Sequence, residues 1–218
     1  MPKFARLVVP GYPHHITQRG IRKQRTFFDD SDYRAYAKLL ANLKESAGVS
    51  IWSYCLMPNH VHVVAVPSDR RALAKLFGVV HQRYAKRVNA QHGWHGHLWQ
   101  ARFFSAVMDE SHALAAMRYI ELNPVRAGLC DRPELWPWSS VHAHLGTRTD
   151  ALVDGCSLID DIDNWVEFLD DYAASDLIDS LRSTTRTGRP AGDSEFIDRL
   201  ESETRRRIHR LKPGPKRF

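Results

Sequence analysis

The stretch at residues 57–64, with the sequence MPNHVHVV, constrains the fold more than any other part of the chain. Pro58 and Asn59 favour a turn, and the mostly β-branched or apolar residues that follow favour a buried strand. Side chains alternate between the two faces of a strand, so His60 and His62 share a face, roughly 6–7 Å apart. Two imidazoles so placed can bind a metal, although by itself an HxH pair is more often an ordinary pair of histidines.

The segments around this stretch alternate between strand and helix patterns. We expect strands at 13–19, 49–57, 60–66 and 98–107, and helices from about 30 to 46, 69 to 90 and 110 to 122. The order β-α-β-β-α-β-α is the ferredoxin-like, split βαβ plan with one further helix. The sequence therefore predicts an α+β fold with a central antiparallel sheet, helices on one face, and the other face free to carry a site.

Charge is distributed unevenly along the 218 residues, whose formal net charge is +6. Residues 1–150 have a net charge of +9, residues 151–181 have nine acidic side chains and no Lys or Arg, and residues 182–218 have a net charge of +6. A basic body favours a polyanionic partner, with nucleic acid before an anionic membrane.

The same pattern predicts two regions, a domain at 1–148 and an extension at 149–218. In the extension we expect an acidic amphipathic helix at 157–181, a linker at 183–192, a helix at 193–211 and a basic tail. The cysteines number three, which is odd, and show no CxxC spacing; this argues against a disulfide framework or a zinc knuckle and favours a reducing cytoplasm. No run approaches 18 apolar residues, so we expect no membrane span, and the N-terminal apolar patch is too short for a signal peptide.

A second chemical signal lies at 119–128, in the sequence YIELNPVRAG. Tyr119 and Asn123 are four residues apart on an expected helix, so they share a face with Cβ atoms about 6 Å apart. An amide oxygen is a neutral metal ligand, and a phenol can attack a phosphodiester when a metal polarises the phosphoryl oxygen. Mixed N/O ligation with open positions suits Mg²⁺ or Mn²⁺ acting as a Lewis acid.

Each of these residues also has an ordinary structural explanation. Tyr119 alone is more typical of a core aromatic, and Asn123 alone is more typical of a helix end before Pro124. Taken with His60 and His62 on a body of net charge +9, a joint site is the better interpretation.

The two motifs together resemble those of a known family. MPNHVH resembles the HUH motif (His, hydrophobic, His) of single-strand DNA transposases and rolling-circle nucleases. YIELNPVRAG is similar to the single-tyrosine helix of REP-associated tyrosine transposases (RAYTs), in the IS200-like group. The HITQRG sequence that starts at His15 and LWQAR at 98–102 fit the same group, and the resemblance covers about residues 4–145.

The resemblance implies an HUH endonuclease fold and a metal-dependent enzyme that cleaves and rejoins single-stranded DNA. Tyr119 would attack a scissile phosphate, leaving a 5′-phosphotyrosine link and a free 3′-OH, while His60, His62 and Asn123 hold Mg²⁺ or Mn²⁺. The substrate would be a REP or BIME-like palindromic hairpin, bound by a monomer rather than a homodimer in the bacterial cytoplasm, at the nucleoid. The candidate DNA contacts, chosen from charge and placement, are Arg19, Arg22, Lys23, Arg25 and Arg102.

Two other functions fit parts of the pattern. A sequence-specific binder of DNA or RNA hairpins that regulates without strand transfer needs the basic body but not Tyr119. A zinc hydrolase built on His60 and His62 needs a third protein ligand and a general base. Glu121 and Asp109 are the candidates for these roles, but we expect them on the wrong helical face or too far away.

Overall fold

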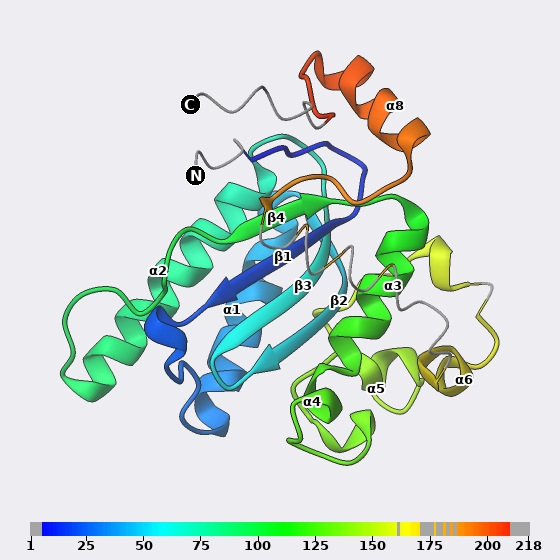
Figure 1. Ribbon diagram of the computed structural model, residues 1–218. Helices are drawn as coiled ribbons and strands as arrows, with labels where there is room; N and C mark the ends of the chain where they lie inside the picture. The colour runs from blue at the N-terminus through cyan, green and yellow to red at the C-terminus, as the bar shows by residue number, and fades with distance from the viewer. Residues whose placement is uncertain are drawn as a thin grey trace, which may run out of the picture.

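Four antiparallel strands form one sheet in the order β2-β3-β1-β4 (Figure 1), which is the order of the split βαβ plan. The computed structural model describes residues 6–160, 162–170, 177, 181, 184 and 187–209. The strands are β1 (His14–Arg19), β2 (Val49–Met57), β3 (His60–Pro67) and β4 (Phe104–Val107). The predicted α+β fold with a central antiparallel sheet is confirmed.

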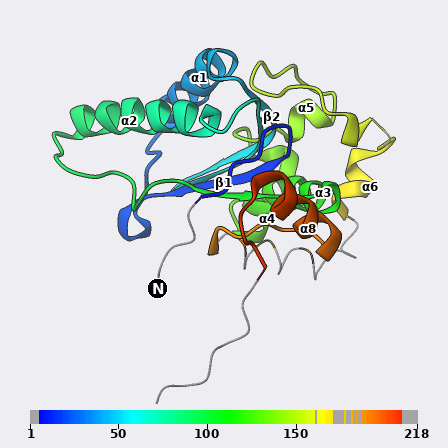
Figure 2. The same ribbon diagram turned by 90° about the horizontal axis from the view of Figure 1, so that it is seen from above.

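Helices α1 (Asp30–Ala47) and α2 (Ala72–His92) cover one face of the sheet (Figure 2). The first helix begins where the Asp29 side chain accepts hydrogen bonds from two backbone amides, and it ends at Gly48, whose φ of 69° favours glycine. The apolar stripes of both helices meet the sheet in the largest core of the described chain. Buried members of this core include Ile16, Leu40, Val63 and Phe77.

Helix α3 (Glu110–Glu121) packs on the opposite face of the sheet and is followed by the short α4 (Asn123–Arg126). The prediction of helices on one face only is therefore wrong. Strand alternation puts Cys55, Met57 and Val64 on this second face, and α3 removes their apolar surface from water. The buried side chains that α3 contributes are Ala113, Ala116, Met117 and Ile120. The helix that contains the candidate tyrosine thus lies over the histidine strand.

The fourth strand is shorter than the predicted strand at 98–107. Only β4 pairs with β1 as a ladder, whereas the preceding segment meets β1 through one isolated bridge between Gly20 and Trp99. The side-chain amide of Gln18 donates a hydrogen bond to the carbonyl of Ala101, in place of a backbone–backbone hydrogen bond of the ladder. The apolar residues of this segment, Leu98, Trp99 and Phe103, are buried in the core with α1 and α2.

The predicted acidic helix at 157–181 is also wrong as one continuous element. Its start is a 3-10 turn, η3 (Ser157–Ile159), and a separate helix, α6 (Trp165–Asp170), follows. The Asn164 side chain accepts hydrogen bonds from the amides of Val166 and Glu167, so it caps a new helix there. Most of the remainder of 171–186 lies outside the described residues. The other short elements are η1 (Ile21–Lys23), η2 (Pro133–Leu135) and α5 (Val141–His144).

The last described helix is α8 (Ser194–Thr204), which is shorter than the predicted helix at 193–211. It ends at Arg205, whose φ is +53°, and the basic tail from 210 onward lies outside the described residues. The extension packs on the domain, because Asp154 pairs with Lys44 and Ala191 bonds to the end of β4. The boundary at 148 stays a prediction. No helix in the described part of the chain is long and apolar enough to cross a membrane.

Candidate active site

The two histidines of β3 lie on the face of the sheet that α3 covers. The ring centroids of His60 and His62 are 4.9 Å apart, as their shared strand face requires. The register with β1 sets Arg19 opposite His60 and Thr17 opposite His62. His60 is partly exposed, whereas His62 is buried with 6% of its surface exposed. The predicted pair therefore faces a common site that opens toward His60.

Asn59 fixes the orientation of the His60 ring. Its amide nitrogen donates to the carbonyl of Lys23 at 3.0 Å, so its oxygen is the atom that faces Nδ1 of His60, at 2.5 Å. An amide oxygen only accepts hydrogen bonds, so Nδ1 of His60 holds the proton in this pair. The lone pair of the neutral ring is then on Nε2, where it can bind a metal.

His15 of β1 does the same for His62. Nε2 of His15 lies 2.9 Å from Nδ1 of His62, and the two rings are stacked with centroids 5.1 Å apart. When Nδ1 of His62 donates to Nε2 of His15, the lone pair of the His62 ring is on Nε2, where it can bind a ligand. Both histidines of the pair thus have an ordered neighbour at Nδ1, which is the usual arrangement around metal-binding imidazoles.

Burial keeps these imidazoles neutral. Desolvation, with a further contribution from Arg19, lowers the pKa of His60 to about 3. Desolvation also lowers the pKa of His15 to about 4 and places the pKa of His62 well below its usual range. Metal ligands must be deprotonated, so the pair is ready to coordinate a cation at neutral pH.

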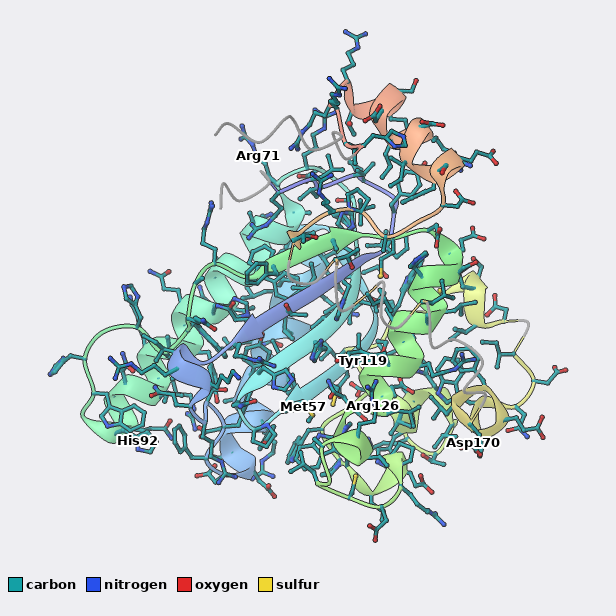
Figure 3. The ribbon with its side chains drawn as sticks, viewed as in Figure 1. Met57, Arg71, His92, Tyr119, Arg126 and Asp170 are labelled. Atoms are coloured by element: carbon teal, nitrogen blue, oxygen red, sulfur yellow. The ribbon has the colours of Figure 1, made fainter. Side chains whose placement is uncertain are left out.

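Tyr119 comes to this site from α3. Its ring centroid lies 5.8 Å from that of His62, and the guanidinium carbon of Arg126 lies 4.9 Å from the ring centre (Figure 3). Arg126 is seven residues after Tyr119, two helical turns on, which puts it on the same side. Tyr119 and the histidine pair therefore lie close together within one chain, as predicted, and the guanidinium of Arg126 lies beside the tyrosine ring.

A buried network holds the C-terminal turn of α3 in place. The carboxylate of Glu121 is fully buried and accepts hydrogen bonds from Ser140, from Nδ1 of His144 at 2.6 Å and from the indole of Trp165 at 2.8 Å. Nε2 of His144 faces the carbonyl of Trp52 at 3.0 Å. Both imidazole nitrogens face oxygen atoms, so the ring of His144 bridges the carboxylate of Glu121 and the backbone of β2. This pair fixes the end of the helix that positions the tyrosine.

Asn123 begins α4, directly after the end of α3. Its side-chain nitrogen is buried and has no hydrogen-bond partner among the described residues. The unpaired atom is an N–H donor, which cannot bind a cation, so a metal ligand from this residue would have to be its side-chain oxygen. With two neutral imidazoles, the carboxamide provides the mixed N/O donors expected for Mg²⁺ or Mn²⁺, so the donor chemistry fits the predicted metal.

The third ligand of a zinc hydrolase is not supplied. Glu121 is engaged in its own network, and Asp109 caps α3 and bonds to His112. The described residues contain no group of three or more His, Cys, Asp or Glu side chains that could hold a metal. The described residues therefore do not supply the third ligand and the general base of a closed zinc centre.

The five predicted DNA contacts are all exposed but lie in two places. Arg19 is opposite His60, and Arg22 and Lys23 form the η1 turn, both with positive φ. Arg25 follows them, with its Nε bonded to the carbonyl of Phe27. Arg102 instead lines a cavity together with Gln18, which points to the face of β1 opposite to that of Arg19. Arg19 thus lies beside the histidine pair, the η1 turn is tied to it through Asn59 and the carbonyl of Lys23, and Arg102 lies behind the sheet.

Three residues at this site were not identified from the sequence. The sequence indicates a turn at Asn59 and a strand at His15, but not their contacts with the histidine pair, because the partner of His15 depends on the pairing of β1 with β3. Arg126 had a detectable signal, since its spacing from Tyr119 is two helical turns.

The comparisons with known proteins concern the family and the fold of the chain. The family described as "Transposase IS200 like" matches residues 10–123, more than half of the chain. A structure of a REP-associated tyrosine transposase bound to a REP hairpin matches with a TM-score of 0.55 and 19% identity, covering 72% of this chain and 93% of that one. That likeness concerns the fold.

A provisionally assigned transposase from Deinococcus radiodurans R1 matches with a TM-score of 0.39 and 18% identity, over 55% of this chain and 95% of that one. A search of curated proteins gave no match. The family match spans the whole sheet and ends at Asn123, so it contains the histidine pair, the tyrosine and the amide. On this match, the chain belongs to the IS200-like transposase family.

Proposed function

We propose that this transposase cleaves and rejoins single-stranded DNA, with Tyr119 as the nucleophile. The observation that supports this most directly is the 5.8 Å separation of the Tyr119 and His62 rings within one chain. One chain thereby holds every group that the chemistry needs, which favours action as a monomer.

The chemistry is an in-line displacement at phosphorus. The phenolic oxygen of Tyr119 forms a bond to the scissile phosphorus and loses its proton to solvent, while the bond from phosphorus to the 3′-oxygen breaks. The 3′-oxygen takes up a proton and leaves as a free 3′-OH, and the 5′ end remains attached as a phosphotyrosine. Rejoining is the reverse displacement by a 3′-OH, so the energy of the phosphodiester bond is kept.

His60, His62 and Asn123 would hold the divalent cation, Mg²⁺ or Mn²⁺. When bound, the cation supplies Lewis-acid polarisation of the phosphoryl oxygen. The protein's own contributions are the orientation of the two imidazoles by Asn59 and His15, and the placing of Tyr119 by the buried end of α3. The guanidinium of Arg126 lies over the ring of Tyr119, where a cation–π contact helps to hold the ring in place.

The substrate we propose is a DNA hairpin of the REP type with a single-stranded flank, as in the RAYT group. The support is the fold shared with a transposase whose structure contains a REP hairpin, together with the positive residues beside the site. Arg19, Arg22, Lys23 and Arg25 are exposed and free of acidic partners among the described ion pairs, so they can neutralise backbone phosphates.

Replacing Tyr119 with Phe tests the proposal. The variant lacks only the nucleophilic oxygen, so we expect normal hairpin binding and no covalent adduct. The measurement is incubation of labelled single strands with Mn²⁺, followed by denaturing electrophoresis to detect a protein–DNA adduct.

Tyr12→Phe is the matched control, because Tyr12 bonds to Glu203 away from the site and its variant should cleave normally. Adduct formation by Tyr119→Phe at the wild-type level would refute the nucleophile. Binding by the wild-type protein without any adduct, across a panel of hairpins, would favour the regulatory binder instead.

A further inference from the structure

A second feature lies behind the sheet, between α2 and the segment that leads into β4. Figure 1 shows this segment turning back along α2 before it joins the sheet. A cavity of about 690 Å³ lies between them, within the range of ligand pockets in proteins. Gln18 lines it, and its neighbour Arg19 lies opposite His60, so the cavity and the catalytic face lie back to back on the same end of β1.

The walls of the cavity suit a flat apolar group. Phe77, Trp99 and Phe103 supply an aromatic lining. Along α2 the wall consists of small side chains at helical spacing, Ala74, Gly78 and Ala85, which leave the cavity open. These residues all lie in α2 or in the segment at 98–103 that leads into β4, so the fold itself determines the shape of the cavity.

The rim of the cavity is cationic. Arg6, Lys86 and Arg102 line it, and no acidic side chain does so within the described part of the chain. The guanidinium carbon of Arg6 lies 3.6 Å from the ring centre of Phe103 and its group bonds to that residue's carbonyl. Lys86 and Arg102 take part in no described ion pair, so their charge is available to an anion.

A buried polar atom also faces this space. His81 lines the cavity with only 6% of its surface exposed, and its Nε2 lies 2.9 Å from the hydroxyl of Tyr36. Tyr36 is fully buried and makes no other described hydrogen bond, so its hydroxyl is best satisfied as a donor to Nε2. The proton of His81 is then on Nδ1, for which the described residues provide no partner. The cavity thus contains an unused hydrogen-bond donor.

We propose that this cavity binds one unpaired nucleotide of the single-stranded DNA substrate, a site distinct from the catalytic face. The base enters the aromatic lining and accepts a hydrogen bond from Nδ1 of His81, while Lys86 and Arg102 bind the adjoining phosphate. Size, aromatic walls, a free donor and a cationic rim are together the features of single-strand recognition. The inference rests on the proposed function only in taking DNA as the polymer.

Filling the cavity tests the proposal without disturbing the core. A Cβ added at Gly78 meets no heavy atom within 4 Å, so Gly78→Phe places a ring in open space and Gly78→Ala is a matched control. Stacking of a base on an aromatic surface contributes about 1–3 kcal/mol, so the loss of this nucleotide should weaken binding by about 5- to 150-fold. We expect that loss for Gly78→Phe and none for Gly78→Ala.

The measurement is fluorescence anisotropy of a labelled hairpin with a ten-nucleotide flank, in the Tyr119→Phe background so that no strand is cut. A series of flanks with one abasic position each identifies the bound nucleotide. Protein with the unfilled cavity should bind more weakly when one particular flank nucleotide is abasic. Gly78→Phe should show no further loss of affinity for the flank that is abasic at that position. Arg102→Gln should lower the slope of log K against log salt by about 0.7.

Two results would overturn the proposal. One is unchanged affinity of Gly78→Phe when its thermal unfolding matches that of Gly78→Ala. The other is a flank series without a sensitive position. Neither result bears on the role of Tyr119 as nucleophile, because the cleavage assay compares Tyr119→Phe with the wild-type protein separately. Conversely, cleavage by Tyr119→Phe would refute the nucleophile but would not change the expected difference in DNA affinity between Gly78→Phe and Gly78→Ala.

Discussion

The stability of this protein should fall steeply in mild acid, because two histidines far from the catalytic face are buried without charge. Nδ1 of His14 donates to the carbonyl of Tyr12 and its Nε2 accepts the amide of Val9, so protonation breaks the second bond. His81 is enclosed by aromatic rings beside Tyr36. Burial lowers the pKa of His14 to about 4 and that of His81 to about 3.

The sign follows from the order of protonation. Above pH 6.5 both histidines are neutral in the folded and in the unfolded protein, so they add no pH dependence to the free energy of unfolding. Below pH 6.5 the unfolded chain takes up protons first, and the penalty grows until the folded pKa is reached, near pH 4 for His14 and pH 3 for His81. At pH 5 the difference of about 1.5 pH units amounts to roughly 2 kcal/mol for each residue, or about 4 kcal/mol together.

Urea unfolding followed by tryptophan fluorescence at pH 7.5, 6 and 5, with EDTA present, measures this loss. His81→Gln removes one of the two groups, so its free energy of unfolding should fall by about 2 kcal/mol less between pH 7.5 and pH 5 than that of the wild type. The exposed His95→Gln is the matched control and should follow the wild type. An identical pH dependence in His81→Gln and the wild type would refute the reasoning.

Three further predictions concern the site. Asn59→Ala should weaken Mn²⁺ binding by about 10- to 100-fold, because the ligand ring loses its orienting partner; titration followed by electron paramagnetic resonance measures this. Glu121→Ala should lower the free energy of unfolding in urea by about 1–3 kcal/mol, because Ser140, His144 and Trp165 lose their buried acceptor. Arg126→Ala should slow adduct formation by about 2- to 5-fold, because the phenol of Tyr119 loses an adjacent cation.

Each of these variants has an exposed counterpart of the same residue type. The counterparts are Asn42→Ala, Glu45→Ala and Arg83→Ala. Equal Mn²⁺ affinity of the two asparagine variants would contradict the orienting role, and equal stability of the two glutamate variants would exclude a stabilising role for the hydrogen bonds of Glu121. An adduct rate for Arg126→Ala that matches Arg83→Ala would show that the cation does not act on the phenol.

Local periodicity was enough to predict the sheet and the histidine pair. The alternation of side chains along one strand sets His60 and His62 on one face whatever the rest of the chain does. The same argument fails for the fourth strand, because Leu98, Trp99 and Phe103 are apolar for burial against α1 and α2 rather than for a place in the ladder. Apolar content alone does not distinguish these two causes.

Contacts between distant segments could not be predicted in this way. The neighbour of His62 at Nδ1 is His15, 47 residues away, and the choice depends on the register between β1 and β3. The buried partners of Glu121 come from β2, α5 and α6, which no pattern within α3 indicates. The closeness of Tyr119 to the pair was expected only from the joint chemistry of the motifs, and the position of α3 explains it.

The bond between Asn59 and the carbonyl of Lys23 has a mechanical consequence. It ties the basic η1 turn to the ring of His60 through one amide side chain. Arg22 and Lys23 have positive φ, which is an unfavourable backbone conformation for residues other than glycine. The turn should therefore change its conformation easily. A nucleic acid strand that pulls on this turn would therefore also move the ring of His60, and binding at the turn would reach the histidine pair without any movement of the sheet.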